Sequence, residues 1–90
     1  MARLDLVKAH LRVDGNEQDD LLNHLIESAR AECCRYTGLA DDDSAFSQPD
    51  VINGIILAVQ ADYDSDATQR ALYLKAAHSL WTPYCRHYGV

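Results

Sequence analysis

Residues 21–39 read LLNHLIESARAECCRYTGL, and their apolar side chains recur at three- and four-residue steps. This spacing places them on one stripe of an α-helix, because a helix completes a turn every ~3.6 residues. Gly38 suits the left-handed residue that ends many helices. We therefore predict a long amphipathic helix over residues 17–36. Its apolar stripe must be covered by other helices or by a neighbouring subunit.

A shorter helix is expected before this one. Residues 4–12 carry an apolar stripe, and Asp5 is expected to cap them by accepting from free amides of the first turn. A turn over residues 13–16 follows, in which Gly15 supplies a positive φ. Asn16 is then the expected cap of the long helix.

Two more helices are predicted after residue 47. Pro49 suits the first position of the third helix, because proline has no amide hydrogen to leave unpaired there. Asp66 or Thr68 caps a fourth helix that runs to about Trp81. It ends there because the residue before Pro83 is disfavoured in helical conformation.

The predicted fold is all-α, a small bundle of about four helices with a long central helix, and residues 1–90 are predicted to form one domain. Gly54 lies inside the third helix, where glycine costs about 1 kcal/mol relative to alanine. Close packing of another helix within the subunit is the simpler explanation. The predicted core consists of Leu22, Leu25, Ile26, Ala29, Cys33, Val51, Ile52, Ile55, Ile56, Val59, Leu72, Ala76 and Leu80.

Composition argues against nucleic acid and membrane as binding partners. The 90 residues carry a formal net charge of −6, which repels a polyphosphate, and their lysines and arginines are scattered. No apolar run approaches the ~18 residues of a membrane span. A soluble, intracellular protein without membrane contact is expected.

Motifs for catalysis and metal binding are missing. The four histidines lie in different predicted elements without metal-ligand spacing, and each is expected at the surface: His10, His24, His78 and His87. The three cysteines Cys33, Cys34 and Cys85 are expected to be small buried side chains plus one partly exposed thiol. Asp41, Asp42 and Asp43 lack the spacing of a calcium loop. We therefore predict no catalytic residues, no cofactor and no metal, and hence no enzyme.

Four residues near the carboxyl end are candidates for contact with a partner. Tryptophan, tyrosine and arginine dominate binding hot spots, and here they gather as Trp81, Tyr84, Arg86 and Tyr88. Alternatively, Trp81 belongs to the core and the tyrosines cover it. A subunit or partner interface is the predicted role of this group.

The order of several motifs resembles the head-tail connector, or head-completion adaptor, proteins of long-tailed bacteriophages. In that family a helix like residues 6–14, LVKAHLRVD, precedes an acidic cap and a long helix with a stop like Tyr36-Thr37-Gly38. A helix begun by proline follows, as at Pro49. The family closes near a Leu-x-x-Pro-Tyr-x-Arg sequence, which matches residues 80–86.

This resemblance implies a structural virion protein without catalysis. It implies a homo-oligomeric ring, expected to be dodecameric in the particle, that joins the portal protein to a tail-side completion protein. DNA would pass through the ring without sequence-specific binding. The implied location is the virion neck between head and tail, after assembly in the host cytoplasm. A small helical protein-binding or regulatory module remains the alternative.

Overall fold

The computed structural model describes residues 4–63 and 66–85, which form four α-helices and two short 3₁₀ segments and contain no strand. This confirms the predicted all-α bundle. The longest of these helices, α2, has 19 residues. The elements in order are α1 (Leu4–Leu11), α2 (Asp19–Thr37), η1 (Ser44–Ser47), α3 (Pro49–Tyr63), α4 (Ala67–Trp81) and η2 (Thr82–Tyr84).

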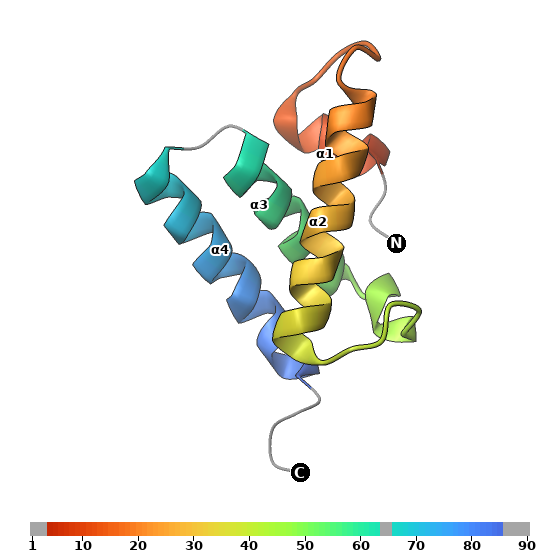
Figure 1. Cartoon of the computed structure of the whole chain (residues 1–90), viewed down its shortest axis with the longest axis vertical. Coiled ribbons are helices and arrows are strands. Elements are labelled where there is room, and N and C mark those ends of the chain that lie inside the picture. Colours follow the sequence, from red (N-terminus) through yellow and green to blue (C-terminus); the bar gives the residue numbers. More distant parts are fainter. Residues whose placement is uncertain (1–3, 64–65, 86–90) are drawn as a thin grey trace.

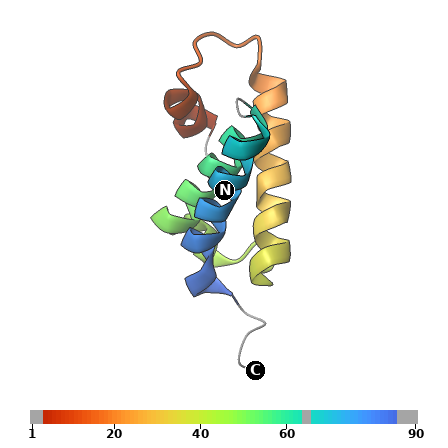
Figure 2. The same cartoon turned by 90° about the vertical axis from the view of Figure 1, so that its left-hand side faces the viewer.

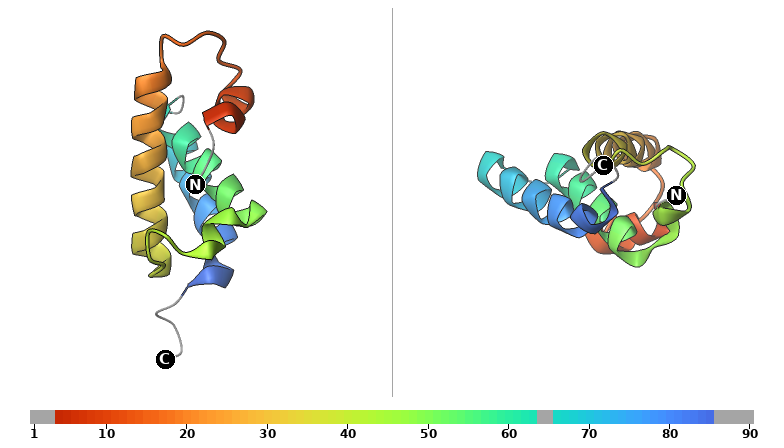
Figure 3. Two further views of the ribbon diagram at one scale, coloured as in Figure 1. Left: turned by 90° about the vertical axis from the view of Figure 1, so that its right-hand side faces the viewer. Right: turned by 90° about the horizontal axis from the view of Figure 1, so that it is seen from below.

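The helices α3 and α4 form an antiparallel hairpin, and α2 packs against it with its carboxyl end beside that of α4 (Figure 1). Turned views place α1 and α2 on opposite sides of α3, joined by a loop at one end of the molecule (Figures 2 and 3). Both α2 and α3 contact each of the other three helices.

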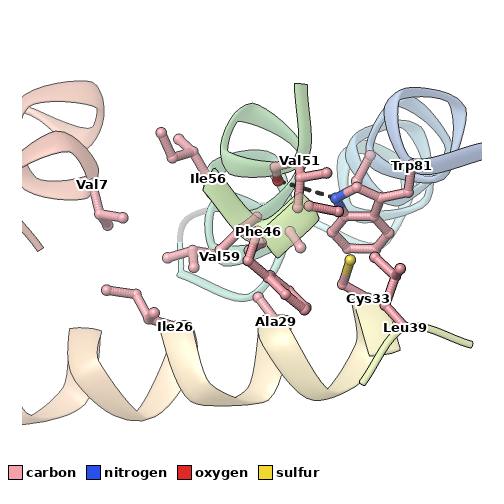
Figure 4. Close-up of a cluster of buried hydrophobic side chains, with 14 of the residues drawn as sticks. Val7, Ile26, Ala29, Cys33, Leu39, Phe46, Val51, Ile56, Val59 and Trp81 are labelled. Carbon is pink, nitrogen blue, oxygen red and sulfur yellow. Dashed lines mark hydrogen bonds between the residues drawn. The ribbon is translucent and has the colours of Figure 1, made fainter. Parts of the chain in front are cut away.

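The core lies where α1, α2 and the hairpin meet (Figure 4). Ten of the thirteen predicted core residues belong to this core. Leu25 and Ile52 are half-buried, and the other eight lie below a tenth exposed: Leu22, Ile26, Ala29, Cys33, Val51, Ile55, Ile56 and Val59.

The predicted core positions on α4 are wrong in part. Leu72 is 63% exposed, Ala76 is exposed and Leu80 is only half-buried. The side of α4 that faces α3 is set by Ala77 and Trp81, both fully buried. At about 100° per residue, Leu72 is rotated by roughly 140° from Ala77 and points away from α3.

Both predicted caps at the amino-terminal end of the molecule are also wrong. Asp5 lies inside the first turn of α1, and α2 begins at Asp19, after Gln18, which makes no side-chain cap bond. The intervening loop is held by Lys8, whose ammonium group donates to the carbonyl of Gly15 at 2.6 Å and pairs with Asp19 at 2.8 Å. Gly15 has the predicted positive φ, 78°.

The predicted end of α2 is confirmed. Gly38 is left-handed, with φ 79°, and its amide donates to the carbonyl of Cys34 at 2.8 Å. Thr37 is fully buried because its hydroxyl donates to the carbonyl of Cys33 and accepts from the amide of Leu39. The chain therefore turns back at once and buries Leu39 in the core.

The segment that follows Leu39 is held by contacts of Asp43, Arg30 and Phe46. The carboxylate of Asp43 accepts from the amide of Ala45 at 2.9 Å and so caps η1, which buries Phe46. Arg30 stacks on the ring of Phe46 at 4.4 Å and donates to the carbonyl of Asp41 at 2.6 Å. Helix α3 then begins at Pro49, as predicted, and Asp66 caps α4 by accepting from the amide of Gln69 at 2.8 Å.

Candidate functional site

The candidate site lies where α2 and α4 end side by side, and the buried side chain of Trp81 lies beneath it. The indole is fully buried and donates from Nε1 to the carbonyl of Val51 at 3.2 Å (Figure 4). Its ring lies against Gly54. A Cβ atom built on Gly54 would stand 2.8 Å from Cδ1 and Cε2 of Trp81. Glycine at position 54 thus makes room for the indole, which confirms close packing within the subunit.

An aromatic stack covers the indole. The ring of Tyr36, near the end of α2, lies parallel to the His78 imidazole, with 4.3 Å between centroids and 3° between planes. Both rings are tilted against Trp81, at centroid distances of 6.4 Å for Tyr36 and 5.7 Å for His78. Arrangements of this kind add about 0.5–1.5 kcal/mol beyond the area that the rings bury.

Hydrogen bonds join this stack to η2. The hydroxyl of Thr82 donates to the carbonyl of His78 at 2.7 Å, so its oxygen accepts from the hydroxyl of Tyr36 at 2.8 Å. The thiol of Cys85 donates weakly to the carbonyl of Tyr36 at 3.7 Å. These contacts fix the direction in which the chain leaves α4.

His78 is held in its neutral form. Burial lowers its pKa below the usual 6.5, and the nearby Arg35 lowers it further. Nε2 of His78 lies 3.1 Å from a carboxylate oxygen of Glu32, which also pairs with Arg35. Because a carboxylate only accepts, the neutral imidazole donates to Glu32 through Nε2. His78 is therefore half-buried in a network, whereas the sequence predicted a surface residue; His10 and His24 are exposed, as predicted.

Two thiols near this site, those of Cys33 and Cys34, have raised pKa values. Burial raises the pKa of Cys33 to about 11, with Cys34 beside it adding to the effect. Burial, and then the charge of Asp41, also raises the pKa of Cys34. Across residues 4–63 and 66–85, no three histidine, cysteine, aspartate or glutamate side chains gather where they could hold a metal ion. None of the helices in the same part of the chain has the length and apolar character to cross a bilayer.

The four predicted interface residues differ in where they lie. Trp81 is in the core, as the alternative interpretation expected, and so presents no surface of its own. Tyr84 is half-buried and packs against the core from η2. Arg86 and Tyr88 lie outside the described residues. Sequence reasoning missed Tyr36 and Thr82, although the motif Tyr36-Thr37-Gly38 had marked the helix end that brings Tyr36 to this place.

Comparisons with known proteins give one finding. The model of the family described as "Phage gp6-like head-tail connector protein" matches residues 1–71. The matched part covers α1, α2, η1, α3 and the first turn of α4, and it ends before His78 and Trp81. No curated protein and no solved structure matches the chain.

Proposed function

This chain belongs to the phage gp6-like head-tail connector family, and we propose that it forms an oligomeric ring that joins the portal to the tail in a long-tailed phage or prophage. Its family is one of structural proteins of the virion neck. The match over residues 1–71 carries the proposal, since it spans the first three helices of the bundle.

The net negative charge of the chain supports a ring through which DNA passes. A formal net charge of −6 disfavours tight binding of duplex DNA, so DNA would pass through the ring without being held. The expected partners are further copies of the chain, twelve in the particle, then the portal protein and a tail-side completion protein. Assembly would take place in the host cytoplasm, before the ring is built into the neck.

The carboxyl end of α4 supplies the contact with a partner in this proposal. Hydrogen bonds that join Thr82 to Tyr36 and His78 hold η2 in place, and Tyr84 of η2 is half-buried against the core. We assign Tyr84, Arg86 and Tyr88 to the subunit or partner interface, and Trp81 to positioning them. Alanine at residue 84, 86 or 88 is expected to leave the helical content unchanged and to weaken assembly.

Native mass spectrometry and negative-stain microscopy of the purified chain, alone and mixed with a portal assembly, test the proposal. Closed rings, or a stoichiometric complex with the portal, are expected. A chain that stays monomeric and also fails to bind the portal contradicts it. A monomer alone does not, because some rings close only on the template that they bind.

A further inference from the structure

Helix α1 packs on the bundle through few side chains. Val7 is its one fully buried residue, and it faces Ile26 of α2 and Ile56 of α3 (Figure 4). The large apolar side chains of α1 besides Val7 are half-buried: Leu4, Leu6 and Leu11. An isolated helix of eight residues is marginal in water, so α1 takes its stability from this surface. The apolar surface of α2 and α3 in turn needs a helix of this pattern to cover it.

A loop at one end of the molecule, residues 12–18, connects α1 to α2 (Figures 2 and 3). Six of its seven residues are exposed, and only Val13 is half-buried. Seven residues can span about 23 Å when the chain is extended. The loop is therefore held by little of the core, and it is long enough to carry α1 to a neighbouring copy.

This loop begins with a strained residue. Arg12 has φ 59°, in the left-handed region that glycine adopts readily and arginine does not. The Arg12 side chain is exposed, and among residues 4–63 and 66–85 it has no hydrogen bond or ion pair that offsets this cost. Strain in a hinge loop favours exchange of the element that the loop carries. Arg12 therefore marks residues 12–18 as a hinge.

Exchange of α1 between copies would keep its contacts with α2 and α3. Val7 would meet the same two isoleucines on a neighbour. The ammonium group of Lys8, which pairs with Asp19 of α2 at 2.8 Å, would pair with the same aspartate of that neighbour. The bond that Lys8 donates to the carbonyl of Gly15 at 2.6 Å lies within the folded-back loop, so it would be given up. The left-handed conformation of Arg12 would be released at the same time.

We infer that α1 of one copy packs on α2 and α3 of the next copy in the ring, in the place that α1 holds within the single chain. The contacts of Val7 with these helices identify the occupant, because they show which helix the surface fits. Each chain then gives α1 to one neighbour and receives α1 from the other, which is the heterologous contact that a ring requires. The inference rests on the proposed function, and it adds how neighbouring copies are joined.

Photo-crosslinking in mixed assemblies tests the exchange. Chains with a small diazirine amino acid in place of Val7 are mixed in urea with an equal amount of heavy-isotope-labelled parent, refolded together, and assembled alone or on a portal assembly. About half of the adducts in the assembled fraction are expected to join residue 7 to labelled peptides that contain Ile26 or Ile56, because both kinds of neighbour are equally available. Monomers separated from the same mixture are the control, and their adducts should lie within single chains.

Two variants of Arg12 test the hinge without altering the core. Arg12→Gly removes the backbone strain, whereas Arg12→Ala keeps it, and both remove the same charge. Arg12→Gly is therefore expected to shift the equilibrium from assembled chains toward monomers about fivefold relative to Arg12→Ala. Sedimentation velocity, or the amount of chain bound to the portal assembly, measures this shift. Both variants are expected to keep the helical circular dichroism of the parent.

Assembled rings in which every adduct of residue 7 lies within a single chain overturn the exchange and leave the proposed function standing. Equal association of Arg12→Gly and Arg12→Ala also contradicts the exchange, because the strain at residue 12 would then have no part in it. A parent chain that neither self-associates nor binds the portal removes both the exchange and the proposed function.

Discussion

Replacing Gly54 by alanine tests the packing of α3 against α4. On an ordinary helix position this change is stabilising, because alanine is favoured over glycine by about 1 kcal/mol. Here the new Cβ atom would stand 2.8 Å from Cδ1 and Cε2 of Trp81 and closer still to Nε1. Relaxed contacts between carbon atoms are about 3.5–4.0 Å, so the indole must shift by roughly 0.7 Å or more.

The displacement outweighs the gain in helix propensity. Overpacking a dense core costs about 1–3 kcal/mol. Moving the indole also weakens its hydrogen bond to the carbonyl of Val51, which is 3.2 Å long and contributes about 1 kcal/mol. After the gain of about 1 kcal/mol is subtracted, Gly54→Ala is expected to lower the free energy of unfolding by about 1–3 kcal/mol.

Urea denaturation followed by circular dichroism measures this difference by linear extrapolation. Trp81 is the sole tryptophan of the chain, so its fluorescence reports the shift of the indole directly. Asn53→Ala is the matched control, because it changes an exposed neighbour on the same helix and is expected to stabilise by about 0.5 kcal/mol. In a Trp81→Phe background, Gly54→Ala should cost less, since the atoms that it meets belong to the five-membered ring of the indole.

The reasoning is refuted if Gly54→Ala is as stable as the parent, or more stable, with unchanged tryptophan fluorescence. Equal effects of Gly54→Ala in the parent and in the Trp81→Phe background would also contradict it, because residues in contact do not contribute additively to stability.

Three further predictions concern the core and the site. Ile55→Asp should abolish soluble folding, because residue 55 is fully buried and the charge would have no partner, while Leu72→Asp at its exposed position should keep the parent's circular dichroism. The free energy of unfolding should fall as the pH drops below about 6.5. The pKa of His78 is lowered in the folded protein, so the unfolded chain takes up this proton first. Urea titrations across pH measure this fall, which should be smaller in His78→Gln. Cys33, with its pKa of about 11, should react with a disulfide reagent at pH 8 only after unfolding, and rapid reaction of the native Cys34→Ser, Cys85→Ser protein would contradict its burial.

Local signals predicted the helix ends where a single residue type is required. Gly38 adopts the left-handed conformation that closes α2, and Pro49 starts α3, because the conformational limits of these residues do not depend on the rest of the fold. The start of α2 could not be predicted in this way. Lys8 reaches across from α1 to bind Gly15 and Asp19, and this contact between elements places Asn16 in the loop.

The spacing of apolar residues could not predict which side of α4 faces α3. Its apolar residues lie on nearly all sides, so Leu72 and Ala76 fit a core stripe as well as Ala77 does. What decides the rotation is the fit of Trp81 against Gly54, a contact between helices that neither sequence segment reveals alone. The same reason explains why Tyr36, Thr82 and the half-burial of His78 were missed at the candidate site.

The fit of the indole against Gly54 has an evolutionary consequence. Neither position can change freely while the other is kept, since a larger residue at 54 requires a smaller ring at 81. Among natural variants of this chain the two positions should therefore diversify as a pair, with glycine retained wherever tryptophan is.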